Sequence, residues 1–123
     1  MVDKVTNMER ILSILKRHRL AAQTEEELQA AIAACFDAEG IEFRREHHLS
    51  PADRVDFLVG RTGVEVKVGG SQSALIRQVH RYAQSEELDA IIIVTTRAYH
   101  TIPADQISGC RVVVVNLVME NAF

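Results

Sequence analysis

The densest set of residues that could do chemistry lies between residues 54 and 68. This segment reads RVDFLVGRTGVEVKV, with apolar and polar residues alternating on both sides of a glycine-bounded turn. Alternation around such a turn predicts a β-hairpin. Side chains two apart on a strand share a face, so we expect Asp56 to project together with Glu65 and Lys67.

The expected register pairs Val59 with Val64 across a four-residue turn, which places Asp56 opposite Lys67. The other face should be an apolar layer, formed by Val55, Phe57, Val59, Val64, Val66 and Val68. Two acids and a lysine in so apolar a segment are costly to bury without partners. A divalent metal held by the two carboxylates would be such a partner.

The Asp56…Glu65-Val66-Lys67 arrangement resembles the active-site motif of the PD-(D/E)xK nuclease superfamily. Members of this superfamily have the restriction-endonuclease-like fold. Where their motif has a variable proline before the aspartate, this chain has Val55. The resemblance implies a three-layer α/β/α core with a mixed central sheet, to which this chain adds an N-terminal helix.

A second motif matches the RecB-like branch of the superfamily, close to the Holliday-junction resolvases. Gln78 and Tyr82 have its Gln-x-x-x-Tyr spacing, and in that branch both residues lie beside the catalytic lysine and orient it or touch DNA. Arg77 and Arg81 form another pair one helical turn apart, and we expect them to contact phosphate or solvent. Arg54 shares the face of the hairpin acids, so it should meet a phosphate or pair with an acid.

The resemblance also implies a site and a reaction. Asp56, Glu65 and the main-chain carbonyl of Val66 would hold Mg²⁺, which Mn²⁺ can replace, because hard cations prefer oxygen ligands. Lys67 would position the attacking water or stabilise charge that develops on the phosphate. The reaction would be hydrolysis of a phosphodiester bond, with the metal activating the water, and Gln78 would belong to the catalytic set.

A helix is predicted from Glu25 to Ala38, with Thr24 as its N-cap and Glu27 completing a capping box. In the superfamily this helix commonly contributes a glutamate from its first turn to the metal site. The apolar stripe of the helix, continued back one turn, reaches Glu25, which we therefore assign this role. The alternative is that the first-turn glutamates are solvated acids, favoured there by the helix dipole.

The remaining elements complete a single domain over residues 1–123, with a core at 24–116 and a helical extension at 1–20. A helix at 6–19, with Asn7 as its cap, should pack on a sheet edge or mediate dimerisation. Strands are expected at 41–49, 89–95 and 111–116, and a helix at 72–85, with strand 89–95 parallel to the second hairpin strand. His47 and His48 should point to opposite faces of their strand; they form a polar strand end, or one of them lines the substrate cleft.

Composition fits an ordinary globular domain, with 47% hydrophobic and 25% charged residues. The formal net charge of −3 is not the basic footprint of a strong nucleic-acid binder. Cys35 and Cys110 read as reduced thiols. With no signal peptide and no membrane-length apolar run evident, we expect a cytoplasmic protein.

Three functions compete. The first is a small Mg²⁺-dependent DNA endonuclease that selects single-stranded, branched or duplex structures. It would act in recombination, repair or phage DNA metabolism. A homodimer of it would make two cuts and contact a longer stretch of DNA. The second is a non-catalytic nucleic-acid-binding or assembly module that retains the nuclease fold. The third is a structural domain with a chance motif, which leaves the placement of Gln78 and Tyr82 unexplained.

Overall fold

A six-stranded mixed sheet forms the centre of the molecule. The computed structural model describes the backbone of residues 4–18 and 20–120 and the side chains of residues 7–18 and 20–118. The strand order is β1-β2-β3-β4-β6-β5. The strands are β1 (Arg44–His48), β2 (Arg54–Val59), β3 (Thr62–Lys67), β4 (Ala90–Thr95), β5 (Gln106–Ile107) and β6 (Cys110–Asn116).

The sheet changes from antiparallel to parallel at β3. Strands β1, β2 and β3 pair antiparallel, whereas β3, β4 and β6 pair parallel, and the short β5 closes the edge beside β6. All six residues of β4 are buried, as befits a parallel strand covered on both faces. The predicted parallel pairing of the second hairpin strand with the strand after the helix is confirmed.

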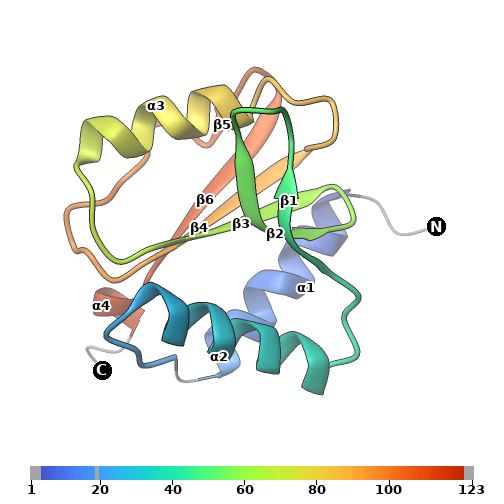
Figure 1. The fold of residues 1–123 in the computed structure, drawn as a ribbon, viewed down its shortest axis with the longest axis vertical. Coiled ribbons are helices and arrows are strands. Elements are labelled where there is room, and N and C mark those ends of the chain that lie inside the picture. Colours follow the sequence, from blue (N-terminus) through green and yellow to red (C-terminus); the bar gives the residue numbers. More distant parts are fainter. Residues whose placement is uncertain (1–3, 19, 121–123) are drawn as a thin grey trace.

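Helices cover both faces of this sheet (Figure 1). They are α1 (Lys4–Arg17), α2 (Glu25–Ala38), α3 (Gln72–Tyr82) and the single-turn α4 (Leu117–Glu120). Apolar residues of α1 and α2 share one buried cluster with one face of the sheet, while those of α3 share a second cluster with the other face. The chain is thus a mixed α/β domain in three layers. No helix among the described residues has the length and apolar character needed to cross a bilayer.

The N-terminal helix α1 belongs to the core. Its buried side chains, which lie in the same cluster as α2, are Met8, Ile11, Ile14 and Leu15. This apolar face is covered by the molecule itself, and a homodimer stays a prediction. The prediction of Asn7 as a helix cap is wrong: Asn7 lies within α1, and its Nδ2 donates a hydrogen bond to the carbonyl of Val59 at 3.2 Å.

The β2–β3 hairpin forms as predicted, but with a different register. Val59 pairs with Thr62 across a two-residue turn, and Phe57 pairs with Val64. The expected four-residue turn was wrong: of the two glycines expected to bound it, Gly60 has the positive φ of a turn glycine (59°), whereas Gly63 lies inside β3. Gly63 is required there by packing, since an added Cβ would lie 3.1 Å from a Val55 methyl carbon. Val55 packs in the α3-side cluster rather than with Phe57.

Candidate active site

Strands β2 and β3 separate beside the two acids, where the main-chain hydrogen bonds between the strands end. The carboxylates of Asp56 and Glu65 accept hydrogen bonds from the main-chain N–H groups there. Beyond the Phe57–Val64 pair, the N–H of Asp56 donates to Glu65 Oε1 at 3.0 Å. In return the N–H of Val66 donates to Asp56 Oδ2 at 2.7 Å. Each acid is therefore fixed by the main chain of the opposite strand. The predicted proximity of Asp56 and Glu65 is confirmed.

Three polar side chains surround the second oxygen of Glu65. Lys67 Nζ lies 3.7 Å from Glu65 Oε2, and Gln78 Nε2 donates to this oxygen at 3.1 Å. The hydroxyl of Tyr82 lies 3.3 Å from it and donates to the carbonyl of Arg54 at 2.7 Å. Gln78 Nε2 also lies 3.0 Å from the Tyr82 hydroxyl. The predicted placement of Gln78 and Tyr82 beside the lysine and the acids is thus confirmed.

Burial dominates the electrostatics of this group. Glu65 is 4% exposed and Asp56 9%. Burial, followed by the charge of Asp56, raises the pKa of Glu65 to about 8. Burial also raises the pKa of Asp56, and the carboxylate of Glu25 adds to the rise. The charge of Lys67 acts in the opposite direction on both acids, but it does not cancel the rise. The positive charge of Lys67 is therefore too little to balance the two buried acids.

The donor set fits a hard divalent cation. Asp56 and Glu65 present carboxylate oxygens, and the N–H and C=O of one strand residue point to the same side. Since the Val66 N–H is bonded to Asp56, the Val66 carbonyl also faces the opened side of the hairpin. Oxygen ligands of this kind suit Mg²⁺. In addition, the side-chain oxygen of Gln78 is buried without a hydrogen-bond partner among the described residues, so one acceptor beside the acids is open.

A hollow of about 400 Å³ connects the acids with solvent. Asp56, Glu65 and Gln78 line it, together with Glu25 from the start of α2 and His48 from the end of β1. Of the two adjacent histidines, His48 is thus the one at the hollow, and the hollow as a substrate cleft stays a prediction. The other histidine, His47, instead pairs with Glu87 at 2.9 Å.

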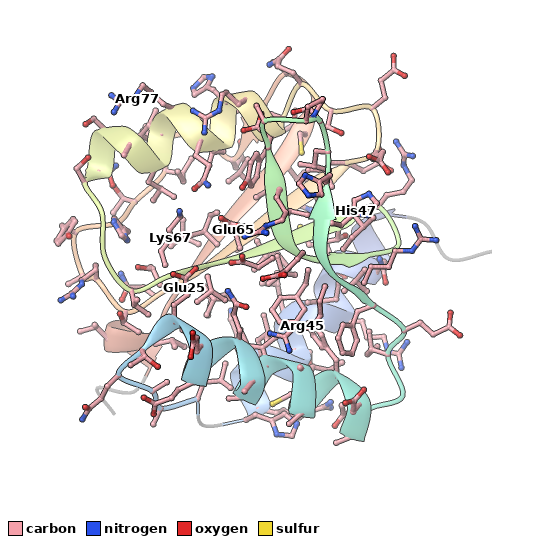
Figure 2. The ribbon with its side chains drawn as sticks, viewed as in Figure 1. Glu25, Arg45, His47, Glu65, Lys67 and Arg77 are labelled. Atoms are coloured by element: carbon pink, nitrogen blue, oxygen red, sulfur yellow. The ribbon has the colours of Figure 1, made fainter. Side chains whose placement is uncertain are left out.

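Glu25 reaches the hollow but does not complete a cluster of ligands. Its helix begins as predicted, with Thr24 Oγ1 accepting from the N–H of Glu27. Figure 2 shows Glu25 across from Glu65 and Lys67. Within the described residues, however, no three Asp, Glu, His or Cys side chains are close enough to hold one metal ion together. The charge of Glu25 contributes to the raised pKa of Asp56, and the role of Glu25 as a direct ligand stays a prediction.

The three predicted nucleic-acid-binding arginines differ in their surroundings. Arg54 is exposed and lies 4.0 Å from Glu46 Oε1, a weak ion pair. Arg81 Nε donates to Asp53 Oδ1 at 3.1 Å. Arg77 is exposed on α3, and among the described residues it has no hydrogen bond or ion pair.

Asp53 was not predicted as part of the site. Asp53 lines the hollow and accepts a hydrogen bond from Arg81. An acid one residue before the strand that carries Asp56 was the available signal, but local sequence does not indicate a partner 28 residues away.

Comparison of the chain with protein-family models, with curated proteins and with solved structures finds no match. The site therefore has to be interpreted from its own geometry.

Proposed function

We propose that this chain is a metal-dependent nuclease that hydrolyses phosphodiester bonds, and that it acts as a small structure-selective DNA endonuclease. One observation carries the proposal: two buried acids are each bonded to the main chain of the other's strand, and a lysine Nζ lies 3.7 Å from one of them, Glu65. Burying two ionised carboxylates with one lysine is unfavourable unless a further cation is bound or one of the acids takes up a proton. A purely structural hairpin would be more stable with apolar residues at these positions.

Each residue has a distinct role in this proposal. Asp56, Glu65 and the Val66 carbonyl hold Mg²⁺, which when bound lowers the pKa of a water molecule and neutralises charge on the phosphate. Lys67, half-buried beside Glu65, stabilises the negative charge that develops on the scissile phosphate. Gln78 is held through its Nε2 by Glu65 and Tyr82, so its open Oε1 can accept a hydrogen bond from water or substrate.

The size of the chain favours selection of DNA structure over sequence. In the described residues the helices and strands pack into one three-layer domain, which leaves few elements free to enter a groove and read base edges. Recognition of sequence needs side chains in a groove, whereas recognition of structure depends on backbone shape and charge. Flaps, junctions and single strands are therefore the proposed substrates.

A non-catalytic binding or assembly module is the second candidate. The observation that favours it is that both acids have a structural task, because they replace the hydrogen bonds that the hairpin loses. The net charge of −3 is also modest support for it. In that case the lysine would serve only to offset the acids.

Cleavage assays with Lys67→Ala separate the two candidates. Labelled single-stranded, duplex, flapped and four-way-junction DNA, and RNA, are incubated with Mg²⁺, Mn²⁺ or EDTA. We expect metal-dependent cutting by the wild type and a loss of roughly 10²–10³-fold in Lys67→Ala, the usual effect of removing one group that stabilises the transition state.

Lys16→Ala is the matched control, because Lys16 is an exposed lysine in the last turn of α1. It should cut like the wild type. If neither wild type nor control cuts any substrate under any metal condition, the nuclease proposal fails and the binding module stands.

A further inference from the structure

A second pocket adjoins the acidic hollow on the side of α3. It has a volume of about 250 Å³. Gln78 and Arg81 line both the pocket and the hollow, so a molecule at the acids lies next to the pocket. We refer to it as the Lys67–Arg81 pocket.

All the charged side chains that line the Lys67–Arg81 pocket are positive. Lys67, Arg77 and Arg81 contribute to it, and its lining, all of it from described residues, includes no acid. Lys67 and Arg81 are partly offset by Glu65 and Asp53 at 3.7 and 3.1 Å. Arg77 at the rim has no such partner in the described part of the chain, and its charge is therefore available to a ligand.

The loop at residues 68–71, part of which lines this pocket, is braced by contacts from residues 97–100. The carbonyl of Gly70 accepts a hydrogen bond from the Tyr99 hydroxyl at 2.9 Å. The same carbonyl oxygen lies 3.0 Å from Nε2 of the buried His100. The Val68 carbonyl accepts from Arg97 Nε at 2.8 Å. In a trans peptide the N–H points away from the carbonyl, so the N–H of Ser71 is directed away from this brace. The carbonyl oxygens of Val68 and Gly70, which would repel an anion, are thus engaged by residues 97–100, which do not line the pocket.

We propose that the Lys67–Arg81 pocket binds a phosphate group of the nucleic acid, adjacent to the phosphodiester bond at the acids. The pocket offers positive charge and no acid, it is preformed, and it shares two residues with the acidic hollow. The inference rests on the proposed function for the identity of the ligand. The phosphate is either an internal one or a terminal one, and both have the chemistry that the pocket recognises.

Substitution of Ala74 tests the pocket directly. Ala74 lines it and is exposed on α3, so Ala74→Glu places a carboxylate there without disturbing the core. The readout is binding of short labelled single-stranded DNA in EDTA, measured by fluorescence anisotropy. We expect Ala74→Glu to weaken binding at least about tenfold, which corresponds to 1.4 kcal/mol, and Ala74→Gln, of similar size but uncharged, to have a much smaller effect.

Ala34→Glu is the matched control, because Ala34 is an exposed alanine in the middle of α2, on the other face of the sheet. It changes net charge equally and should bind within about twofold of the wild type. In addition, Arg77→Ala should reduce the dependence of log K on log salt by about 0.7, the value for one phosphate contact with a single strand. Equal DNA binding by Ala74→Glu and Ala34→Glu would overturn the proposal that the Lys67–Arg81 pocket binds phosphate.

End-labelled oligonucleotides distinguish the two sources of phosphate. A terminal phosphate is the ligand if removing it weakens wild-type binding but leaves Ala74→Glu unchanged, whereas an internal phosphate is the ligand if Ala74→Glu weakens binding whatever the end group. Because binding is measured in EDTA, absence of cleavage does not affect the test. Conversely, Lys67-dependent cleavage with equal binding by Ala74→Glu and Ala34→Glu would keep the nuclease and reject the pocket.

Discussion

At the scale of single residues, Glu65 connects the structure of the hairpin with its chemistry. One carboxylate oxygen accepts the N–H of Asp56, and the other is shared by Gln78 and Lys67. These contacts fix the side chain, but none offsets the burial that raises its pKa to about 8. Metal-free protein must therefore hold a proton at Glu65 near neutral pH, or bear the cost of a buried charge.

This cost predicts how the stability of the metal-free protein depends on pH. The folded pKa of Glu65 lies above the ordinary value of 4.5, so the folded state binds a proton that the unfolded state has released. The contribution of this proton to the free energy of unfolding is complete below about pH 4.5. It is lost as pH rises towards 8, by at most about 1.4 kcal/mol per pH unit for one proton. Urea unfolding in EDTA at several pH values measures it.

Glu65→Gln should reduce this slope, because glutamine keeps the shape and does not titrate. The exposed Glu9→Gln is the control and should leave the slope as in the wild type. A slope that is the same in all three proteins would mean that Glu65 is ionised in the folded metal-free state.

The sequence predicted this residue cluster even though it misplaced the strand register. The expected pairing of Asp56 with Lys67 differs by two residues from the observed Phe57–Val64 register. A shift of two residues preserves the face on which each side chain lies, whereas a shift of one reverses it. Asp56, Glu65 and Lys67 were therefore expected on the correct face. The exchange of hydrogen bonds between the acids and the main chain could not be predicted, because it depends on where the ladder ends.

At the scale of elements, the hairpin turn is held by a helix that is distant in sequence. Asn7 of α1 donates to the carbonyl of Val59, and the next residue, Gly60, has a φ of 59°. A Cβ on Gly60 would lie 3.2 Å from Asn7 Nδ2. The turn therefore needs glycine both for its backbone conformation and for this contact.

Gly60→Ala should accordingly be destabilising for two reasons. The left-handed conformation costs about 1–2 kcal/mol for a non-glycine residue, and displacement of the Asn7 amide loses a hydrogen bond worth about 1 kcal/mol. Gly109→Ala is the control, because Gly109 also has positive φ (80°) but would meet nothing within 4 Å. Thermal unfolding of both variants measures the difference.

In an Asn7→Ala background the second contribution disappears, so Gly60→Ala should then cost about as much as Gly109→Ala. An equal cost of the two glycine substitutions in the wild-type background would show that the Asn7 contact does not stabilise the turn.

The elements themselves were predicted unequally. Helix α2 was predicted with its observed bounds because Thr24 caps it and its apolar stripe is regular. The two-residue β5 and the single-turn α4 were not predicted, since so few residues carry no periodic pattern. The brace of loop 97–100 on the loop after β3 was also missed, because it joins segments 29 or 30 residues apart.

At the scale of the whole molecule, the acids lie where three layers meet. Asp56 and Glu65 belong to central strands, α3 supplies Gln78, and α2 supplies Glu25. Unfolding separates these elements and destroys the site. A cation held there binds only the folded chain, so its binding energy adds to the stability of the entire domain.

This linkage predicts that Mg²⁺ raises the melting temperature. At 100 times its dissociation constant, a ligand specific to the folded state adds about 2.7 kcal/mol, which for a domain of this size corresponds to roughly 5–15 °C. Asp56→Asn should remove the effect, since the amide retains an oxygen for the Val66 N–H but loses the charge that attracts the metal. Asp37→Asn, at an exposed acid near the end of α2, should keep it. Differential scanning calorimetry with Mg²⁺ and with EDTA measures the shift. An equal shift in wild type and Asp56→Asn would place the stabilising cation elsewhere on the molecule.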